Sequence, residues 1–319
     1  MKNAVRKALP LIDLALMPLV YPAGRLLGAI RAIGVHRLPR CRKMLLQIGV
    51  FPIRNHYYEP QFDHRQPAQD FSSDRALPGI DWNLEGQLAE LQNMHYAGEL
   101  ADLPSRPTGD HSFHLDNGAF LSGDAEYWYQ LIRARKPARI FEIGSGHSTL
   151  MARKAIAMNR AEDAGYSCRH VCIEPYEMPW LEQTGVSVVR KKVEDVAVSF
   201  FSELGENDIL FIDSSHIIRP QGDVLFEYLE LLPTLRKGVI VHVHDIFSPR
   251  NYLSSWLQEK VLFWNEQYLL EAFLCHNRDW EIIGALNYLQ HNHYAELKRV
   301  APYLSPEREP GSFYLRKVA

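Results

Sequence analysis

The feature that most constrains the fold is a repeated alternation of short apolar runs and helix-like segments from residue 124 onwards. Five runs have the length and composition of buried strands: 139–143, 169–174, 186–190, 208–213 and 239–245. Helix-like segments are expected at 124–135, 148–158, 221–235 and, as one long helix, 256–276. Two later runs, 280–286 and 311–316, have the spacing of a hairpin with no full helix between them. This pattern predicts an α/β fold with a mostly parallel sheet and an antiparallel last hairpin.

A glycine turn, Gly144-Ser145-Gly146, follows the first of these strands and precedes a helix that begins near Ser148. Glycine lets backbone amides approach a ligand closely, and the helix N-terminus favours an anionic group. Open α/β sheets bind ligands beyond the carboxyl ends of their strands. The turn therefore predicts a cofactor site, the alternative being an ordinary strand–helix turn with a chance pair of glycines.

Two acids near the turn distinguish between cofactors. A dinucleotide fingerprint requires a third glycine where this chain has Thr149. Glu142, just before the turn, is unsuited to a pyrophosphate but suits an ammonium group and a sulfonium centre. Glu174 ends the second strand, where it can accept both ribose hydroxyls of either cofactor. Together these residues favour S-adenosylmethionine.

These motifs resemble class I S-adenosylmethionine-dependent methyltransferases and, more narrowly, the bacterial group known as methyltransferase domain 24. The resemblance covers most of residues 46–317 and rests on segments 56–60, 115–118, 142–150, 211–216, 242–247, 264–268 and 311–313. It implies a Rossmann-like, seven-stranded sheet with S-adenosylmethionine as cofactor. It leaves the methyl acceptor undefined, although some relatives lie among genes for cell-envelope glycans.

The resemblance also assigns cofactor contacts. It implies that the methionine end of the cofactor is bound by the turn residues Glu142, Gly144, Ser145, Gly146 and Ser148. Glu174 matches the acid that binds the ribose, and Asp213 is expected to contact the cofactor as well. Glu194 and Asp195 follow the third strand, where the adenine usually lies, although a charged pair at a strand end is often only solvated.

Acidic and imidazole side chains follow the fourth and fifth strands. Because adjacent strands lie about 4.8 Å apart, Asp213 and Asp245 can share one small site. Methyl transfer to a hydroxyl requires alignment of the acceptor and removal of a proton. His216, with an ordinary imidazole pKa near 6.5, is the candidate base, and an orienting role is its alternative.

This layout resembles metal-dependent O-methyltransferases such as catechol O-methyltransferase, in which carboxylates after these strands hold magnesium. The resemblance implies a divalent ion on Asp213, His244 and Asp245. Those enzymes have a further acidic or amide ligand where this chain has Ile246, and a histidine ligand favours Mn²⁺ or Zn²⁺ over Mg²⁺. As alternatives, Asp245 contacts the cofactor or caps a turn. His242 is expected to be a hydrogen-bonded core residue.

The first 58 residues form a basic, apolar segment with ten lysines and arginines against one acid, Asp13, whereas the whole chain has a net charge of −3. This composition favours binding to an anionic membrane surface, and no nucleic acid is expected. The alternative is a helical arm packed on the domain or on a second subunit of a homo-oligomer. Pro10, Pro18 and Pro22 are expected to break any long helix, and no uninterrupted apolar stretch is long enough to span a membrane.

We therefore predict three parts: a basic amphipathic arm at 1–45, a lead-in at 46–115, and the methyltransferase domain at 116–319. Within the lead-in, His56, Tyr57, Tyr58 and Glu59 are predicted to form a lid, or else to anchor the arm. Four cysteines without a C-x-x-C motif indicate reduced thiols and a cytoplasmic protein, peripheral at the inner membrane.

The predicted function is S-adenosylmethionine-dependent methylation of a sugar or glycan-type hydroxyl, assisted by Mg²⁺, Mn²⁺ or Zn²⁺. The acceptor is a small molecule, a glycan or a glycolipid. One alternative is a non-catalytic module that binds the cofactor or a partner. Another is a metal-dependent hydrolase that uses His242, His244 and Asp245, which leaves the turn after Glu142 unexplained.

Overall fold

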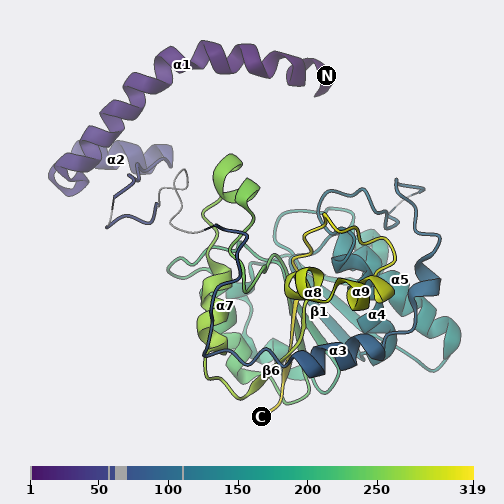
Figure 1. The fold of residues 1–319 in the computed structure, drawn as a ribbon. Helices are drawn as coiled ribbons and strands as arrows, with labels where there is room; N and C mark the ends of the chain where they lie inside the picture. The colour runs from purple at the N-terminus through teal and green to yellow at the C-terminus, as the bar shows by residue number, and fades with distance from the viewer. Residues whose placement is uncertain (1, 57, 62–69, 110) are drawn as a thin grey trace. The chain divides into compact units, whose positions relative to one another are not determined.

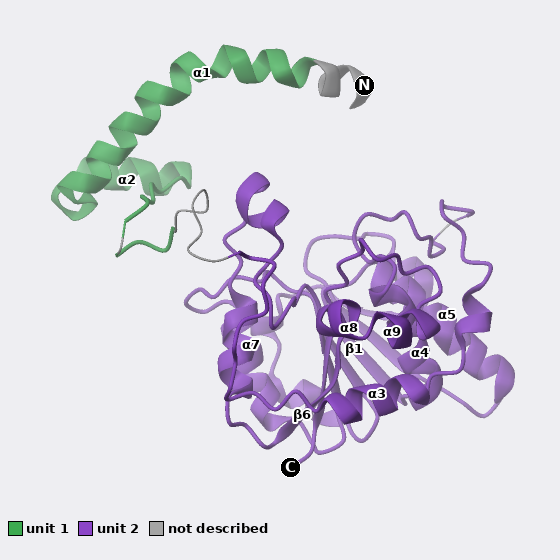
Figure 2. Cartoon of the chain, viewed as in Figure 1, with its two compact units in different colours: residues 1–68 green, residues 69–319 purple. Residues whose placement is uncertain are grey.

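The computed structural model describes residues 2–56, 58–61, 70–109 and 111–319. The chain divides into two compact units, residues 1–68 and 69–319 (Figure 2). The second unit begins before the predicted domain boundary at residue 116, because Leu91 and Leu100 belong to its hydrophobic core.

A seven-stranded sheet forms the centre of the second unit, in the order β3-β2-β1-β4-β5-β7-β6 among the described residues. The strands are β1 (Arg139–Ile143), β2 (Arg169–Ile173), β3 (Ser187–Val189), β4 (Ile209–Ile212), β5 (Ile240–Val243), β6 (Trp280–Ala285) and β7 (Phe313–Lys317). Strands β1 to β5 pair in parallel, and β7 pairs antiparallel with both β5 and β6. The predicted α/β class with a mostly parallel, Rossmann-like sheet is confirmed.

The register aligns the carboxyl ends of the central strands. Ile143 pairs with Ile173 on one side and with Ile212 on the other, and Ile212 pairs with Val243. The residues that follow these positions in the chain therefore gather at one edge of the sheet.

Helices cover both faces of the sheet (Figure 1). The α-helices of this unit are α3 (Leu84–Gln92), α4 (Asp124–Arg135), α5 (His147–Glu162), α6 (Asp223–Phe226), α7 (Glu266–Leu274), α8 (Leu286–Asn292) and α9 (Tyr294–Val300). Shorter helical turns are η2 (Ala97–Leu100), η3 (Leu181–Thr184), η4 (Val193–Asp195), η5 (Val198–Glu203), η6 (Glu227–Leu231), η7 (Leu232–Thr234) and η8 (Ser255–Glu259). The predicted helix 221–235 corresponds to α6, η6 and η7 in succession.

The core lies in two layers because successive strand residues point to opposite faces. Ile140 and Phe211 face α3, α4, α5, α8 and α9. Phe141 and Leu210 face α6 and α7. All four side chains are fully buried, as expected of strands in a sheet that is covered on both sides.

Two predictions about the last third of the chain are wrong. The helix expected at 256–276 is divided into η8 and α7, because Val261 between them has a positive φ of 55°, which a right-handed helix cannot accommodate. β6 and β7 are adjacent and antiparallel, but α8 and α9 connect them in place of a hairpin turn.

The first unit contains α1 (Lys2–Ile33), η1 (Val35–Arg37) and α2 (Pro39–Ile48). Contrary to expectation, α1 continues through Pro10, Pro18 and Pro22, and Figure 1 shows it as one bent helix. Each proline removes only one backbone donor, so the remaining hydrogen bonds carry the helix past a kink. By length and composition alone, its segment Ala8–Ile33, with a mean hydropathy of 1.3, is also long and apolar enough to cross a membrane. By this criterion, the expectation that no segment is long enough to span a membrane is revised.

Candidate active site

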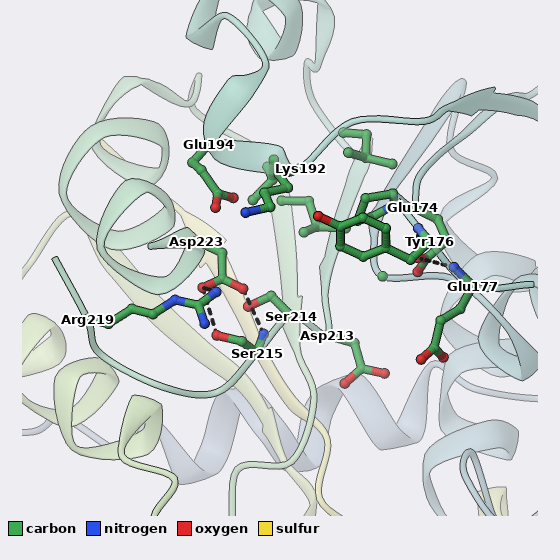
Figure 3. A pocket seen from close by; sticks show the side chains of 15 residues that line it. Glu174, Tyr176, Glu177, Lys192, Glu194, Asp213, Ser214, Ser215, Arg219 and Asp223 are labelled. Carbon is green, nitrogen blue, oxygen red and sulfur yellow. Dashed lines mark hydrogen bonds and ion pairs between the residues drawn. The ribbon is translucent and has the colours of Figure 1, made fainter. Parts of the chain in front are cut away.

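A cavity of about 420 Å³ opens at the carboxyl edge of the sheet (Figure 3). Its walls come from the loops after β1, β2, β3 and β4: Ile143, Gly144, Ile173, Glu174, Pro175, Tyr176, Glu177, Lys192, Val193, Glu194, Asp213, Ser214, Ser215, Arg219 and Asp223. Acidic side chains outnumber basic ones in this lining. Such a cavity suits a cofactor with a positive centre better than a pyrophosphate.

Gly144 brings the loop after β1 close to the loop after β4. Its φ is +76°, and a Cβ at this position would lie 1.9 Å from the carbonyl oxygen of Asp213. The Gly144 N–H donates to the carbonyl of Ile173 (3.1 Å), and the Asp213 N–H donates to the carbonyl of Ile143 (2.8 Å). Only glycine fits this crossing point of three strand ends.

Glu142 is fully buried beneath the turn and is not among the residues that line the cavity. Its Oε2 accepts from the Thr149 hydroxyl (2.5 Å) and the Ser148 hydroxyl (3.3 Å), and Oε1 lies 2.9 Å from His170 Nε2. Thr149 Oγ1 accepts the Gly146 N–H (3.1 Å). Glu142 therefore holds the turn from below, and this geometry gives it no direct contact with a ligand in the cavity. Ser145, Gly146 and Ser148 are likewise outside the lining.

His170 is a residue that the sequence analysis missed. Burial opposes its charge, but the carboxylate of Glu142 beside it raises the pKa of His170 to about 10. The imidazole is therefore charged at neutral pH and forms a buried ion pair. The available signal was a histidine on β2, two positions before the residue that pairs with Glu142.

Glu174 and Glu194 lie in the cavity wall, and their contact with the cofactor stays a prediction (Figure 3). Glu174 Oε1 accepts the backbone N–H groups of Tyr176 (3.0 Å) and Glu177 (2.9 Å), which fix the carboxylate at the end of β2. Asp195 instead lines a neighbouring hollow between η4 and α6.

Asp213, His216, His244 and Asp245 converge beside the cavity. His216 Nε2 lies 3.3 Å from Asp213 Oδ1 and 3.6 Å from Asp245 Oδ2. His244 Nδ1 lies 3.4 Å from Asp213 Oδ1 and 3.6 Å from Asp245 Oδ1. One potential ligand atom from each of Asp213, His216 and Asp245 lies within 4.8 Å of the others. The sequence predicted this convergence from the ends of β4 and β5.

His216 is enclosed by carboxylates on both of its nitrogens. Its Nδ1 lies 2.8 Å from Oε2 of Glu266, at the start of α7, and its ring packs on Trp264 with 4.3 Å between the ring centroids. Glu266 Oε1 accepts from the Tyr228 hydroxyl (3.0 Å). Burial opposes the charge of His216, but Asp213 and Glu266 raise its pKa well above the ordinary value.

The two aspartates of the cluster differ in their electrostatics. Burial opposes ionisation of Asp213, but His244 and His216 hold its pKa below the ordinary value. Burial raises the pKa of Asp245, and the nearby Asp213 adds to the rise. Burial disfavours the charge of His244, yet Asp245 and Asp213 raise its pKa to about 10. Asp245 also has a left-handed backbone (φ +58°), a strained conformation that is typical of functional sites.

His242 is a buried core residue, as predicted, but without the expected hydrogen bonds. Its ring stacks on Tyr314 with 4.1 Å between the ring centroids, and neither ring nitrogen has a partner among the described residues. Burial lowers its pKa well below the ordinary value. A neutral imidazole enclosed by aromatic rings is a poor member of the predicted hydrolase cluster.

The predicted lid residues belong to the first unit, and Tyr57 lies outside the described residues. Both oxygens of Glu59 accept from the Arg31 guanidinium at 2.7 Å. The Tyr58 N–H donates to Nδ1 of His56 at 3.3 Å. The ion pair joins this segment to α1, and the lid role stays a prediction.

The chain was compared with known proteins. Residues 141–246 match the family model described as a methyltransferase domain. An uncharacterised protein of Archaeoglobus fulgidus is 32% identical over 178 residues, which are 50% of this chain and 76% of that protein. A solved structure, cmcI-D160 Mg-SAM, aligns over 80% of this chain and 98% of its own with 16% identity and a TM-score of 0.36, too low for the likeness to inform on this chain.

The parallel sheet, the glycine turn and the acidic cavity at the strand ends define a class I S-adenosylmethionine-dependent methyltransferase. The chain belongs to the methyltransferase domain family.

Proposed function

We propose that this methyltransferase transfers the methyl group to a sugar or glycan-type hydroxyl with the help of a divalent cation held by Asp213, His216 and Asp245. The observation that carries the proposal is the position of Asp213, which lines the cofactor cavity and also belongs to the cluster of potential ligands.

The separations of the ligand atoms support a cation at this cluster. Metal–ligand bonds of about 2.0–2.2 Å put neighbouring ligand atoms roughly 3–3.5 Å apart. His216 Nε2 lies 3.3 and 3.6 Å from the nearest oxygens of Asp213 and Asp245. Glu266 on the opposite nitrogen of His216 corresponds to the carboxylate that commonly orients a ligating histidine.

This chain's residues have separate tasks in the proposed reaction. S-adenosylmethionine would supply the methyl group and leave as S-adenosylhomocysteine, and a divalent cation would lower the pKa of the acceptor hydroxyl so that its proton is lost to water. Glu174 would accept hydrogen bonds from the ribose hydroxyls, and Gly144 would let the cofactor approach the backbone of the cavity wall. The acidic lining favours the positive sulfonium over a polyanion.

The contacts of His216 favour a ligand over the general base predicted from the sequence. With the proton on Nδ1 held by Glu266, the lone pair of Nε2 faces Asp213 and Asp245, where a cation would lie. A cation there would occupy the lone pair that a general base requires. His244, the histidine ligand predicted from the sequence, remains an additional candidate because its Nδ1 lies 3.4 Å from Asp213.

Trp264 supports a sugar as the acceptor. Its half-buried indole lies against His216, beside the proposed cation. Flat aromatic faces pack against the C–H faces of sugar rings, and cations of this kind bind hydroxyl oxygens. A sugar stacked on Trp264 would present a hydroxyl to the cluster.

Two isosteric variants test the proposal by separating cofactor from cation. Asp245→Asn should abolish cation-stimulated methyl transfer but leave S-adenosylhomocysteine affinity within about threefold of wild type. Glu174→Gln should weaken S-adenosylhomocysteine about tenfold or more, since a hydrogen bond to a charged group is lost, and leave Mn²⁺ binding unchanged. Calorimetry measures both affinities. Full transfer to sugar acceptors by chelator-treated wild type would refute the role of the cation.

A further inference from the structure

Helix α1 presents an unusually apolar surface to solvent. In its segment Ala8–Ile33, no residue of the most apolar 18-residue stretch is buried. Leu9, Leu16, Leu19 and Leu26 are 47–67% exposed. Leucines with this exposure on consecutive turns form a patch, and extended apolar patches mark surfaces that bind something.

Eight apolar residues follow the period of the helix, whereas the exposed Leu11 and Leu14 lie outside their face. Steps of three and four residues connect the members of one face, here called the lipid face: Leu9, Ile12, Leu16, Leu19, Ala23, Leu26, Ile30 and Ile33. Side chains at this spacing lie on one side of an α-helix.

Every charge of the segment lies away from the lipid face. Asp13 and Arg25 are connected by steps of four through Met17 and Tyr21. Arg31 lies five full turns beyond Asp13 and therefore points the same way as Asp13. Asp13 and Arg31 thus flank the lipid face and Arg25 lies on its far side, and the row of Asp13, Met17, Tyr21 and Arg25 is here called the charged face.

We propose that α1 lies in the plane of an anionic lipid bilayer, with the lipid face immersed among the acyl chains and the charged face toward the headgroups. Helices with a large apolar face and charges outside that face bind membranes in this way.

Charge complementarity identifies anionic lipid as the partner. Lys2, Arg6 and Lys7 precede the segment, and Arg37, Arg40, Arg42 and Lys43 follow it. Within residues 1–61 the acids are Asp13 and Glu59, and Glu59 is already paired with Arg31. Basic residues at both ends of an apolar helix are attracted by a negative leaflet.

The placement of charges favours an in-plane helix over a spanning one. A spanning helix needs about twenty predominantly apolar residues. Any window of about that length within Ala8–Ile33 contains at least two of Asp13, Arg25 and Arg31. In the interfacial arrangement these charges stay at the headgroups, whereas a spanning helix would bury them in hydrocarbon.

The test is flotation of the full-length protein with lipid vesicles, which requires no methyl acceptor and is therefore independent of the proposed reaction. Vesicles of phosphatidylcholine alone are compared with vesicles that contain about one-third phosphatidylglycerol. We expect strong binding to the second kind, weak binding to the first, and release at high salt or alkaline pH. Failure of wild type to float with anionic vesicles overturns the proposal.

Two double variants with the same change of charge distinguish the faces. L16E/L19E alters the lipid face and should reduce partitioning at least about a hundredfold. M17E/Y21E alters the charged face and should reduce it by about tenfold or less. Both variants should keep wild-type S-adenosylhomocysteine affinity, which verifies that the catalytic unit is folded.

The remaining outcomes contradict the proposal. If both variants lose vesicle binding to the same extent, and the wild-type protein resists alkaline extraction, the helix spans the membrane. A wild-type dimer in light scattering that L16E/L19E dissociates, without vesicle binding, indicates that a second copy covers the lipid face. Retained flotation of L16E/L19E shows that the lipid face is not the binding surface.

Discussion

The buried pair of His170 and Glu142 yields the sharpest prediction about the cofactor turn. His170→Ala removes the only charged partner that Glu142 has among the described residues, while Glu142 stays fully buried. Removing one member of a buried ion pair costs about 3–5 kcal/mol, because the remaining charge is uncompensated. The rise of the His170 pKa from 6.5 to about 10 corresponds to about 5 kcal/mol of interaction, a similar magnitude.

The same pair predicts a specific pH dependence. A group whose pKa is raised on folding contributes its full stabilisation below its unfolded pKa and loses it as the pH rises through the folded value. The stability difference between wild type and His170→Ala should therefore be largest below about pH 6.5. It should diminish as the pH approaches about 10.

Urea unfolding followed by tryptophan fluorescence measures this effect. All six tryptophans lie in the unit of residues 69–319, so the signal reports the methyltransferase unit. The double variant Glu142→Gln/His170→Ala is the matched control, because it removes the uncompensated charge and should recover about 2 kcal/mol relative to His170→Ala. The reasoning is refuted if His170→Ala lies within about 1 kcal/mol of wild type, or if the double variant is no more stable than the single one.

Other predictions concern the turn, the cavity and an ion pair remote from both. Gly144→Ala places a Cβ against the Asp213 carbonyl, so it should lower the free energy of unfolding in urea by at least about 2 kcal/mol and abolish S-adenosylhomocysteine binding. Near-wild-type binding would show that the two loops can move apart to accept the Cβ. Glu174→Gln should raise the Kd for S-adenosylhomocysteine about tenfold with little change in Tm, and an unchanged Kd would remove Glu174 from the site. Arg133→Met breaks a pair with the partly exposed Glu99 and should cost about 2 kcal/mol at pH 7. Because the hydrogen bond from Arg133 lowers the pKa of Glu99, this cost should fall as the pH drops below about 4.5, and a pH-independent cost would contradict the pairing.

Local patterns in the sequence predicted much of the sheet. The apolar runs gave every strand to within two residues, and helix 124–135 coincides with α4. The parallel register then accounts for the convergence of Asp213 and Asp245, since Ile212 and Val243 are paired. Such features depend on the spacing of apolar residues along the chain and on the regular geometry of a sheet, both of which can be inferred from local sequence.

Contacts between distant segments were not predictable in the same way. Glu266 is 50 residues from His216, and only the path of the chain around Val261 brings its carboxylate to the imidazole. The residue type of Glu142 suggested a ligand contact, whereas the pleat of β1 points its side chain into the core toward His170. A sequence shows that a carboxylate is present, but the direction of its side chain depends on the strand pleat and on which neighbouring groups donate hydrogen bonds to it.

The most direct test of the account is a crystal structure with S-adenosylhomocysteine and Mn²⁺, with anomalous diffraction to locate the ion. We predict the ribose on Glu174 in the cavity beside Gly144, and an anomalous peak with Asp213, His216 and Asp245 at about 2.0–2.3 Å. S-adenosylhomocysteine bound outside this cavity, or an ordered cofactor with no Mn²⁺ between the two aspartates, would contradict the account.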